Sequence, residues 1–449
     1  MMGRHTAARR STAGIFGLIY IVWASGVRAD AFPDTVYFDG FEPCGIRCQR
    51  ATCNAGASTS LSGIVNSPNG LLPLPNVEVY VASSTVDAFV DGPNAPRCDQ
   101  APSGHPILAT LTGTDGHFHL DNVPVVPNLQ VVIVAGKWRR VVQVPSVTAC
   151  VDNVLDADQT RLPATHLEGD IPHTAIVTGA ADAIECLMRK AGVADTEFGA
   201  SSSAARIHLY AGNGTAQSAA GPFASSTTLW ANSTSLSAYD QVMAGCAGDQ
   251  QPSTIQQTNI DAMKTYADNG GRAYFVHWQN IWLAGAISTG QTGAWPTSAT
   301  FDFTKSSPSN GTYSATVLTT DVLLEQFAQW LLNTSASTTL GSVPVMGSYI
   351  RHTAISINAP ARAWASVTTN VTTSQPLMTF TTPFGGTPAG QRGRVLFTDL
   401  HGSAGDASSP SATFPTGDCI SSVTQLTPED KMLLYGIFDL QRCVDSSGE

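Results

Sequence analysis

Residues 269 to 280 read Asn-Gly-Gly-Arg-Ala-Tyr-Phe-Val-His-Trp-Gln-Asn. The glycine pair predicts the end of a helix, and the apolar run 272–276 predicts a short buried strand. His277, Trp278 and Asn280 follow this strand directly. Open α/β sheets place their ligand sites beyond the carboxyl ends of strands. We therefore expect the active or binding site of the protein here.

The composition narrows the class of partner. The chain has 449 residues, of which 43% are hydrophobic and 13% are charged, and its formal net charge is -11. Such a chain can bury at least one large core, and its length suggests two or three domains. The acidic balance disfavours nucleic acid and anionic membrane as partners, so a small polar or glycan ligand fits better.

The amino terminus has the pattern of a secretory signal. Arg4, Arg9 and Arg10 precede an apolar run at 15–24, and small residues around 29–31 offer cleavage sites. The run is shorter than the roughly 20 apolar residues that a transmembrane helix needs, and no other segment could cross a bilayer. We predict a signal peptide over 1–31 and export to the periplasm or the extracellular space.

All nine cysteines follow the signal. In an oxidising compartment most should be paired, and their odd number leaves at least one free or intermolecular. We expect disulfides in the amino-terminal cluster of Cys44, Cys48 and Cys53, and others at Cys419 and Cys443. Zinc binding by the amino-terminal cluster is a weak alternative, since no further ligand stands at the usual spacing. The pairing itself stays open.

The rest of the chain divides into a β part and an α/β part. A Cys-rich segment, 32–60, leads into alternating apolar runs over 61–149 with a hairpin signal at Asp115-Gly116, which predict a small all-β sandwich. A polar linker follows at 150–165. From 166 to 443 strands and helices alternate, which predicts a mostly parallel sheet with helices on both faces. Within it, the Ser/Thr-rich insertion 288–319 is long enough for a functional flap.

The sandwich carries four recognisable patterns: a Ser-Gly-x-Val opening at 62–65, a Pro-x-Val-x-Val-x-Val strand at 75–81, a Thr-Asp-Gly-x-Phe turn at 114–118, and Val123-Pro124. With these it resembles the carboxypeptidase regulatory-like, transthyretin-like domains of secreted bacterial proteins. The resemblance implies a spacer or binding adjunct. Because the fold is shared with starch-binding domains, glycan binding is an expectation by analogy.

Three ordered blocks mark the second domain: Tyr239-Asp240-x-Val242, Tyr266-x3-Gly270-Gly271 and Gly393-Arg394-Val395-x-Phe397-Thr398-x2-His401. Over about 170–442 it resembles the class I glutamine amidotransferase-like superfamily and its ThuA-like branch, which implies a flavodoxin-like α/β fold. Amidotransferases carry a nucleophilic Cys after this strand. This chain has His277 there, so Cys-His acyl transfer is not expected.

The combination of signal peptide, sandwich and ThuA-like domain is similar to a family of secreted bacterial proteins. Some of its members are catalogued as tryptophan synthase alpha chain. That enzyme is a single TIM barrel, whereas this chain has an export signal, a sandwich and too few regular βα units, so we reject the label as a function.

The strongest catalytic candidates are His277, His401 and Asp399. Asp399 and His401 stand two apart at a strand end, so their side chains share a face if the strand persists, and both could converge with His277. Two histidines with a carboxylate can act as general base and acid, or hold a divalent metal with an open position. The alternatives are packing for the histidines and a loop-capping role for Asp399.

Further residues are expected to border the site in binding roles: Trp278, Asn280, Glu168, Asp170, Cys246, His352 and Asp406. Four of them have a structural alternative. Trp278 is a sugar platform or a core aromatic, Cys246 is the unpaired thiol or a disulfide partner, and Glu168 and Asp170 can cap a loop.

Two functions therefore remain. The first is an exported hydrolase or carbohydrate-processing enzyme with His277 and His401 beneath the flap. The second is a non-catalytic extracellular protein that binds glycans or a surface partner and keeps the amidotransferase-like fold as a scaffold. Proximity of the two imidazoles in an open cleft favours the first.

Overall fold

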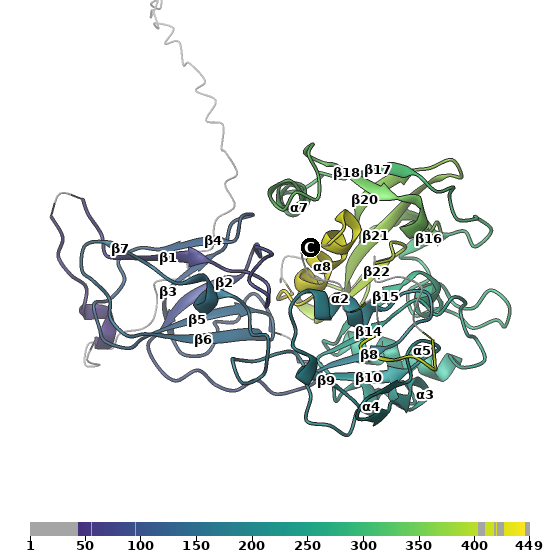
Figure 1. The fold of residues 1–449 in the computed structure, drawn as a ribbon, viewed down its shortest axis with the longest axis horizontal. Helices are drawn as coiled ribbons and strands as arrows, with labels where there is room; N and C mark the ends of the chain where they lie inside the picture. The colour runs from purple at the N-terminus through teal and green to yellow at the C-terminus, as the bar shows by residue number, and fades with distance from the viewer. Residues whose placement is uncertain are drawn as a thin grey trace, which may run out of the picture. The chain divides into compact units, whose positions relative to one another are not determined.

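Two small β-sheets form the first part of the computed structural model, which describes residues 44–54, 56–94, 96–402, 409–416, 419 and 426–444 (Figure 1). The three-stranded sheet has the order β4-β1-β7 and the four-stranded sheet the order β3-β2-β5-β6. The bounds are β1 Ser60–Ile64, β2 Glu78–Ala82, β3 Pro106–Leu111, β4 His117–Leu120, β5 Leu129–Ala135, β6 Trp138–Val144 and β7 Asp152–Val154. Alternate apolar residues of both sheets share one core, as in a sandwich.

The turns of this part differ from the sequence prediction. Asp115-Gly116 does form a turn, with Gly116 at φ +77°. It joins β3 and β4, which belong to different sheets, so the predicted hairpin is wrong. The tight hairpin is formed by β5 and β6. Their last paired residues are Ala135 and Trp138, and Gly136 and Lys137 form the turn between them.

The segment assigned to a linker, 150–165, is built into the structure. It contains β7, which pairs in parallel with β1, and the short helix α1 (Ala157–Thr160). Leu155 and Leu162 are buried in the same hydrophobic cluster as the sandwich core. All described residues fall in one unit that spans 42–449.

An eleven-stranded mixed sheet organises the remainder, with the order β13-β10-β8-β14-β15-β22-β21-β20-β17-β18 and β9 beside β10. Its bounds are β8 Thr174–Val177, β9 Phe198–Gly199, β10 Ile207–Ala211, β13 Ala224–Ser225, β14 Gln241–Ala244, β15 Arg272–Val276, β17 Thr312–Val317, β18 Ser342–Met346, β20 Arg362–Thr368, β21 Thr373–Thr382 and β22 Gly393–Thr398. The strands from β13 to β22 pair in parallel, and those from β22 to β18 pair antiparallel. The mixed α/β class is confirmed, but nearly half of the sheet departs from the parallel pattern.

The remaining elements are short connections and helices: η1 Gly45–Cys48, α2 Ile184–Lys190, η2 Asp195–Glu197, β11 Gln217–Ser218, β12 Gly221–Pro222, α3 Ser226–Leu229, α4 Ser233–Leu236, α5 Gln257–Asp268, η3 His277–Asn280, α6 Ile281–Ala284, β16 Ala299–Phe301, α7 Val322–Asn333, η4 Gly347–Tyr349, β19 Ala354–Ile357, η5 Pro388–Gly390, β23 Thr413–Phe414 and α8 Pro428–Leu440. Among the described residues, the helices are too short or too polar to span a bilayer.

The parallel strands are buried on both faces, which explains their continuous apolar runs. Ile176, Met243 and Tyr274 pack in the cluster that contains residues of α2, α7 and α8. Val242 and Phe275, from the opposite face, pack in a second cluster with α5 and α6. Each strand thus separates two helical layers, and its carboxyl end emerges between them.

The predicted flap, 288–319, is only partly a loop. It contains β16 and ends in β17, where the Ser and Thr side chains mostly face solvent and the alanine and valine face the core. Short polar strands of this kind lack the apolar signal that marks β15.

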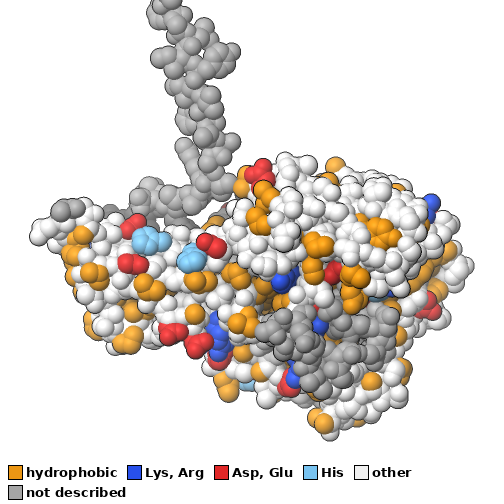
Figure 2. Space-filling view, turned by 45° about the horizontal axis from the view of Figure 1, so that its top comes forward, with side chains coloured by type: hydrophobic (Ala, Val, Ile, Leu, Met, Phe, Trp, Pro, Cys, Tyr) orange, Lys and Arg blue, Asp and Glu red, His pale blue; other side chains and the backbone are white. Residues whose placement is uncertain are grey.

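Charged side chains on the face drawn in Figure 2 are scattered rather than gathered in one patch.

Four disulfides join cysteines that are mostly far apart in the chain: Cys44–Cys48, Cys53–Cys150, Cys98–Cys443 and Cys186–Cys419. Cys246 is the free thiol, and it is buried. The expectation of disulfides is confirmed, and four of them are compatible with an exported protein. The amino-terminal cluster is engaged in disulfides rather than in a zinc site.

Glu185 in α2 supports a prediction about pH. It is fully buried, its carboxylate oxygens have no hydrogen-bond partner among the described residues, and burial raises its pKa to about 7. The folded state therefore holds this proton more tightly than the unfolded state, so the group destabilises the fold increasingly as pH rises from about 4.5 through about 7. The unfolding free energy of Glu185→Gln minus that of the wild type should therefore rise by about 3 kcal/mol from pH 4 to pH 8. Urea unfolding of both proteins at both pH values measures this change. If the difference between the two proteins is the same at pH 4 and pH 8, the pKa of Glu185 is not raised in the folded state.

Candidate active site

His277 occupies a sharp turn between strand and helix. It follows β15 directly, begins η3, and has φ +45°, which is uncommon for a residue with a side chain. Gln279 holds the turn, because its amide donates to the Gly245 carbonyl at 3.1 Å and its side-chain oxygen accepts from the Trp282 indole at 2.8 Å. The turn directs the His277 imidazole toward the ends of the neighbouring strands.

His401 reaches the same place from β22. The ring centroids of His277 and His401 lie 5.3 Å apart, so the two histidines do converge. The His401 backbone N–H donates to the Tyr349 carbonyl at 2.9 Å, and its ring contacts the Ala181 backbone. Its Nε2 is buried and has no partner among the described residues. That nitrogen is available to a ligand.

Cys246 is the third member of this group. It follows β14, and its Sγ lies 3.4 Å from His277 Nδ1. One ligand atom from each of Cys246, His277 and His401 can be chosen so that all three lie within 4.8 Å of one another. The sequence analysis placed Cys246 near the site, and the parallel pairing of β14 with β15 explains its contact with His277.

The three side chains border a cavity of about 390 Å³. Its lining also includes Arg351, Lys305, Ser306, Ser307, Gly248, Ala181, Trp278 and His352. Among the described lining residues, two side chains carry a positive charge and none is a carboxylate. The lining favours a polar ligand with an acidic group.

Burial controls the charge of the site. Burial, with the neighbouring His401 and Arg351, holds the pKa of His277 well below its usual range. Burial and Arg351 lower the pKa of His401 to about 3. Both imidazoles are therefore neutral near pH 7, when they can accept a proton or bind a metal. Burial raises the pKa of Cys246 to about 12, although the Trp278 and Gly248 backbone amides oppose this shift.

Asp399 points away from the histidines. Its carboxylate accepts from the Thr353 hydroxyl at 2.6 Å and from the Ala354 N–H at 2.7 Å. It is fully buried, its pKa is raised to about 6 by burial, and it is absent from the cavity lining. The contacts are those of a carboxylate that anchors the chain before β19, so the expected convergence with His401 does not occur.

Glu168 and Asp170 lie in ion pairs outside the cavity lining. Glu168 makes a two-pronged contact with the Arg161 guanidinium at 2.6 and 2.7 Å, which lowers its pKa to about 2. Asp170 pairs with Arg139 of β6 at 2.8 Å. The Ala164 N–H donates to Glu168 at 2.8 Å, which agrees with the capping alternative for Glu168, whereas Asp170 is held by its ion pair.

The other predicted binding residues fall into those that line the cavity and those that do not. Trp278 and His352 line the cavity. Both His352 ring nitrogens are engaged, by Ser374 and Thr369 at 2.8 Å each, so its ring is a fixed wall. Asn280 is fully buried beneath the turn and accepts from Gln250 at 2.6 Å. Asp406 lies outside the described residues.

Sequence reasoning missed two charged lining residues. Arg351 precedes His352, which was expected to border the site, but no periodicity indicates that the Arg351 side chain does so too. Lys305 comes from the predicted flap, whose length was the only signal. Both are contributed by loops, which carry no local pattern that fixes their direction.

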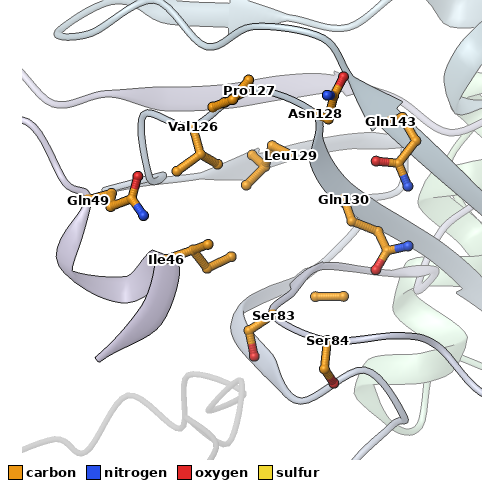
Figure 3. Close-up of a pocket in the computed structure, with 11 residues that line it drawn as sticks. Ile46, Gln49, Ser83, Ser84, Val126, Pro127, Asn128, Leu129, Gln130 and Gln143 are labelled. Atoms are coloured by element: carbon orange, nitrogen blue, oxygen red, sulfur yellow. The ribbon is translucent and has the colours of Figure 1, made fainter. Parts of the chain in front are cut away.

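A second cavity, of about 540 Å³, lies in the sandwich (Figure 3). Its polar lining is dominated by four amide side chains, from Gln49, Asn128, Gln130 and Gln143. Gln130 and Gln143 stand directly opposite each other on β5 and β6. The described lining contains no charged side chain, which suits a neutral polar ligand.

Comparisons with known proteins leave the family open. No family model and no curated protein matches the chain. Two solved cohesin–X-dockerin complexes from Acetivibrio cellulolyticus, an amino-terminal and a carboxy-terminal interface mutant, align with 32% of this chain and 78% of theirs. Their sequence identities are 16% and 15%, and the TM-score is 0.16 in both cases. So low a score carries no argument about fold or function.

Proposed function

We propose that this protein is an exported hydrolase that acts on a small, carbohydrate-like substrate with an acidic group. The observation that carries the proposal is the proximity of two imidazoles at one cavity. The ring centroids of His277 and His401 lie 5.3 Å apart, and Arg351 and Lys305 border the same cavity. Neutral imidazoles can orient an attacking water, either by accepting its proton or through a bound ion. The cationic residues would bind the acidic group of the substrate.

The sheet order supports the fold that this proposal assumes. Across the sheet, five parallel strands lie in the order β10-β8-β14-β15-β22. Numbered by their place in the chain, these strands have the order 2-1-3-4-5. This is the flavodoxin-like order, whose ligands bind where the strand order reverses. Ala181 and Cys246 follow β8 and β14, the two strands on either side of that reversal, and His277 follows the next strand, β15. A ThuA-like relative of the glutamine amidotransferases is the family we favour.

Binding tests the proposal first. We expect uronic acids or sugar phosphates to raise the melting temperature of the purified protein, whereas the matching neutral sugars raise it less. Arg351→Gln should weaken acidic ligands about 10- to 100-fold, the loss expected for a charge-assisted hydrogen bond. Arg362→Gln is the control, because Arg362 pairs with Asp321 at 3.2 Å and is not among the cavity residues.

Turnover tests it second. Each ligand that binds is incubated with the protein, and its hydrolysis products are measured. His401→Gln should reduce the rate about 10²- to 10⁴-fold, the usual loss on removal of a proton-transfer group. Ligand binding without hydrolysis would contradict the enzymatic proposal.

The amide-lined cavity of the sandwich favours a second function, which is glycan binding without catalysis. Amides of Gln130 and Gln143 on one sheet face can donate to and accept from sugar hydroxyls. In this case neutral oligosaccharides should bind, Gln130→Ala/Gln143→Ala should weaken them, and His401→Gln should have no effect. Isothermal titration calorimetry of the three proteins separates the two functions.

A further inference from the structure

The donor set at the cavity floor is that of a metal centre. One sulfur and two imidazoles come from the ends of β14, β15 and β22, and their ligand atoms lie within 4.8 Å of one another. The separation of Cys246 Sγ and His277 Nδ1 is 3.4 Å. Two ligands at about 2.3 Å and 2.1 Å from one tetrahedral zinc ion would be separated by a similar distance.

An unpartnered nitrogen gives independent evidence of a missing ligand. His401 is 3% exposed, and its Nε2 has no hydrogen-bond partner among the described residues. A buried polar atom without a partner is costly, and such an atom in a native structure is often explained by an ion or a water. Because His401 belongs to the cluster, one ion bound to this nitrogen would satisfy it together with His277 and Cys246.

The surrounding backbone is arranged as around a metal ligand. The Trp278 and Gly248 backbone amides lie beside the Cys246 sulfur. The Ala181 backbone contacts the His401 ring, whose Nε2 remains free. Such outer contacts orient metal ligands and select the histidine tautomer.

We infer that Cys246, His277 and His401 bind one zinc-class divalent ion whose fourth coordination position opens into the cavity. Binding transfers the Cys246 thiol proton to solvent and forms a metal–thiolate bond, while both neutral imidazoles donate lone pairs. An anionic fourth ligand beside Arg351 and Lys305 would balance the local positive charge. The inference deepens the proposed function, on which it rests for the role of the ion but not for its binding.

Metal binding is measured without substrate, on the untagged mature chain with its disulfides intact. The protein is stripped with a chelator and titrated with Zn²⁺, and bound metal is counted by mass spectrometry. A parallel Co²⁺ titration follows thiolate-to-cobalt charge transfer, which reports on Cys246. We expect one equivalent of each ion and a higher melting temperature with Zn²⁺.

Three variants and one control decide the assignment. Cys246→Ser, His277→Ala and His401→Ala should each weaken Zn²⁺ by about 100-fold or more, since even outer-contact changes cost 10- to 100-fold. His166→Gln is the control, because His166 pairs with Glu197 at 2.8 Å, is not among the cavity residues and leaves the three ligands in place, so this variant should bind Zn²⁺ as the wild type does. If His277→Ala fails to fold because of its turn, the other two variants still decide.

Failure of this inference is distinct from failure of the proposed function. A folded wild-type protein that binds no Zn²⁺ or Co²⁺, or ligand variants that bind Zn²⁺ as tightly as the wild type, would overturn the metal site. Zinc binding by the three residues without any hydrolysis would keep the site and remove the hydrolase. Hydrolysis that persists in stripped protein would overturn the catalytic role of the ion.

Discussion

Loss of the Cys98–Cys443 disulfide is expected to lower the unfolding free energy by about 4 kcal/mol. The bond has a sequence separation of 345, but the Cys186–Cys419 bond shortens the closed path to about 112 residues, 88 from Cys98 to Cys186 and 24 from Cys419 to Cys443. A cross-link removes more entropy from the unfolded chain as the loop grows. It ties the sandwich part to the residues just after α8. The double variant Cys98→Ser/Cys443→Ser removes it, and urea unfolding measures the loss.

The Cys44–Cys48 disulfide supplies a matched control. Its sequence separation is 4, and both of its cysteines are exposed, as Cys98 is. Cys44→Ser/Cys48→Ser should therefore cost about 2 kcal/mol or less. Equal losses in the two double variants would show that loop length does not govern the contribution of these bonds.

Lys137→Met is expected to cost about 3–5 kcal/mol, because it removes the cation in direct contact with a buried carboxylate and leaves only Arg206, 3.9 Å from Asp240. Lys137 stands at the tip of the β5–β6 hairpin, and its Nζ donates to Asp240 and to the Val90 and Gly92 carbonyls. The Lys137 and Asp240 side chains are each 4% exposed. Burial raises the pKa of Asp240, while Lys137 opposes that shift.

A surface pair tests whether burial is the cause. Lys264 and Asp268 form an ion pair in α5, and the Lys264 side chain is 45% exposed. Lys264→Met should change the unfolding free energy by about 0.5 kcal/mol or less. In addition, Lys137→Met/Asp240→Asn should cost less than the two single changes added together, since the residues are coupled. Strict additivity would contradict a direct ion pair.

Elements with a strong local signal could be predicted from the sequence almost to the residue. The apolar runs 129–135 and 272–276 predict strands, and the segment 428–440, with Thr427 as cap and Pro428 at its first position, predicts a helix. The strands β5 and β15 and the helix α8 have these bounds. For α8, Thr427 caps the first turn and Pro428 occupies its first position, as expected. Such signals lie within a few residues of one another, so no knowledge of distant contacts is needed.

Elements whose stability comes from distant partners were harder to predict. The helix expected over 180–191 begins only at Ile184, because the residues before it form a loop at the cavity edge. The antiparallel strands β17 and β20 contain many small and polar residues, and they are strands because β21 and β18 pair with them. Neither strand has a long apolar run.

The sequence by itself determined the elements with strong local signals, such as β15 and α8, and it placed His277 and His401 at two strand ends, because apolar periodicity and capping are short-range properties. The tertiary structure decided the rest. Strand order brought Cys246 to the histidines, two loops added Arg351 and Lys305, and Asp399 turned toward Thr353 instead. Disulfide pairing also depended on it, since cysteines are joined according to their distance in space and not in the chain.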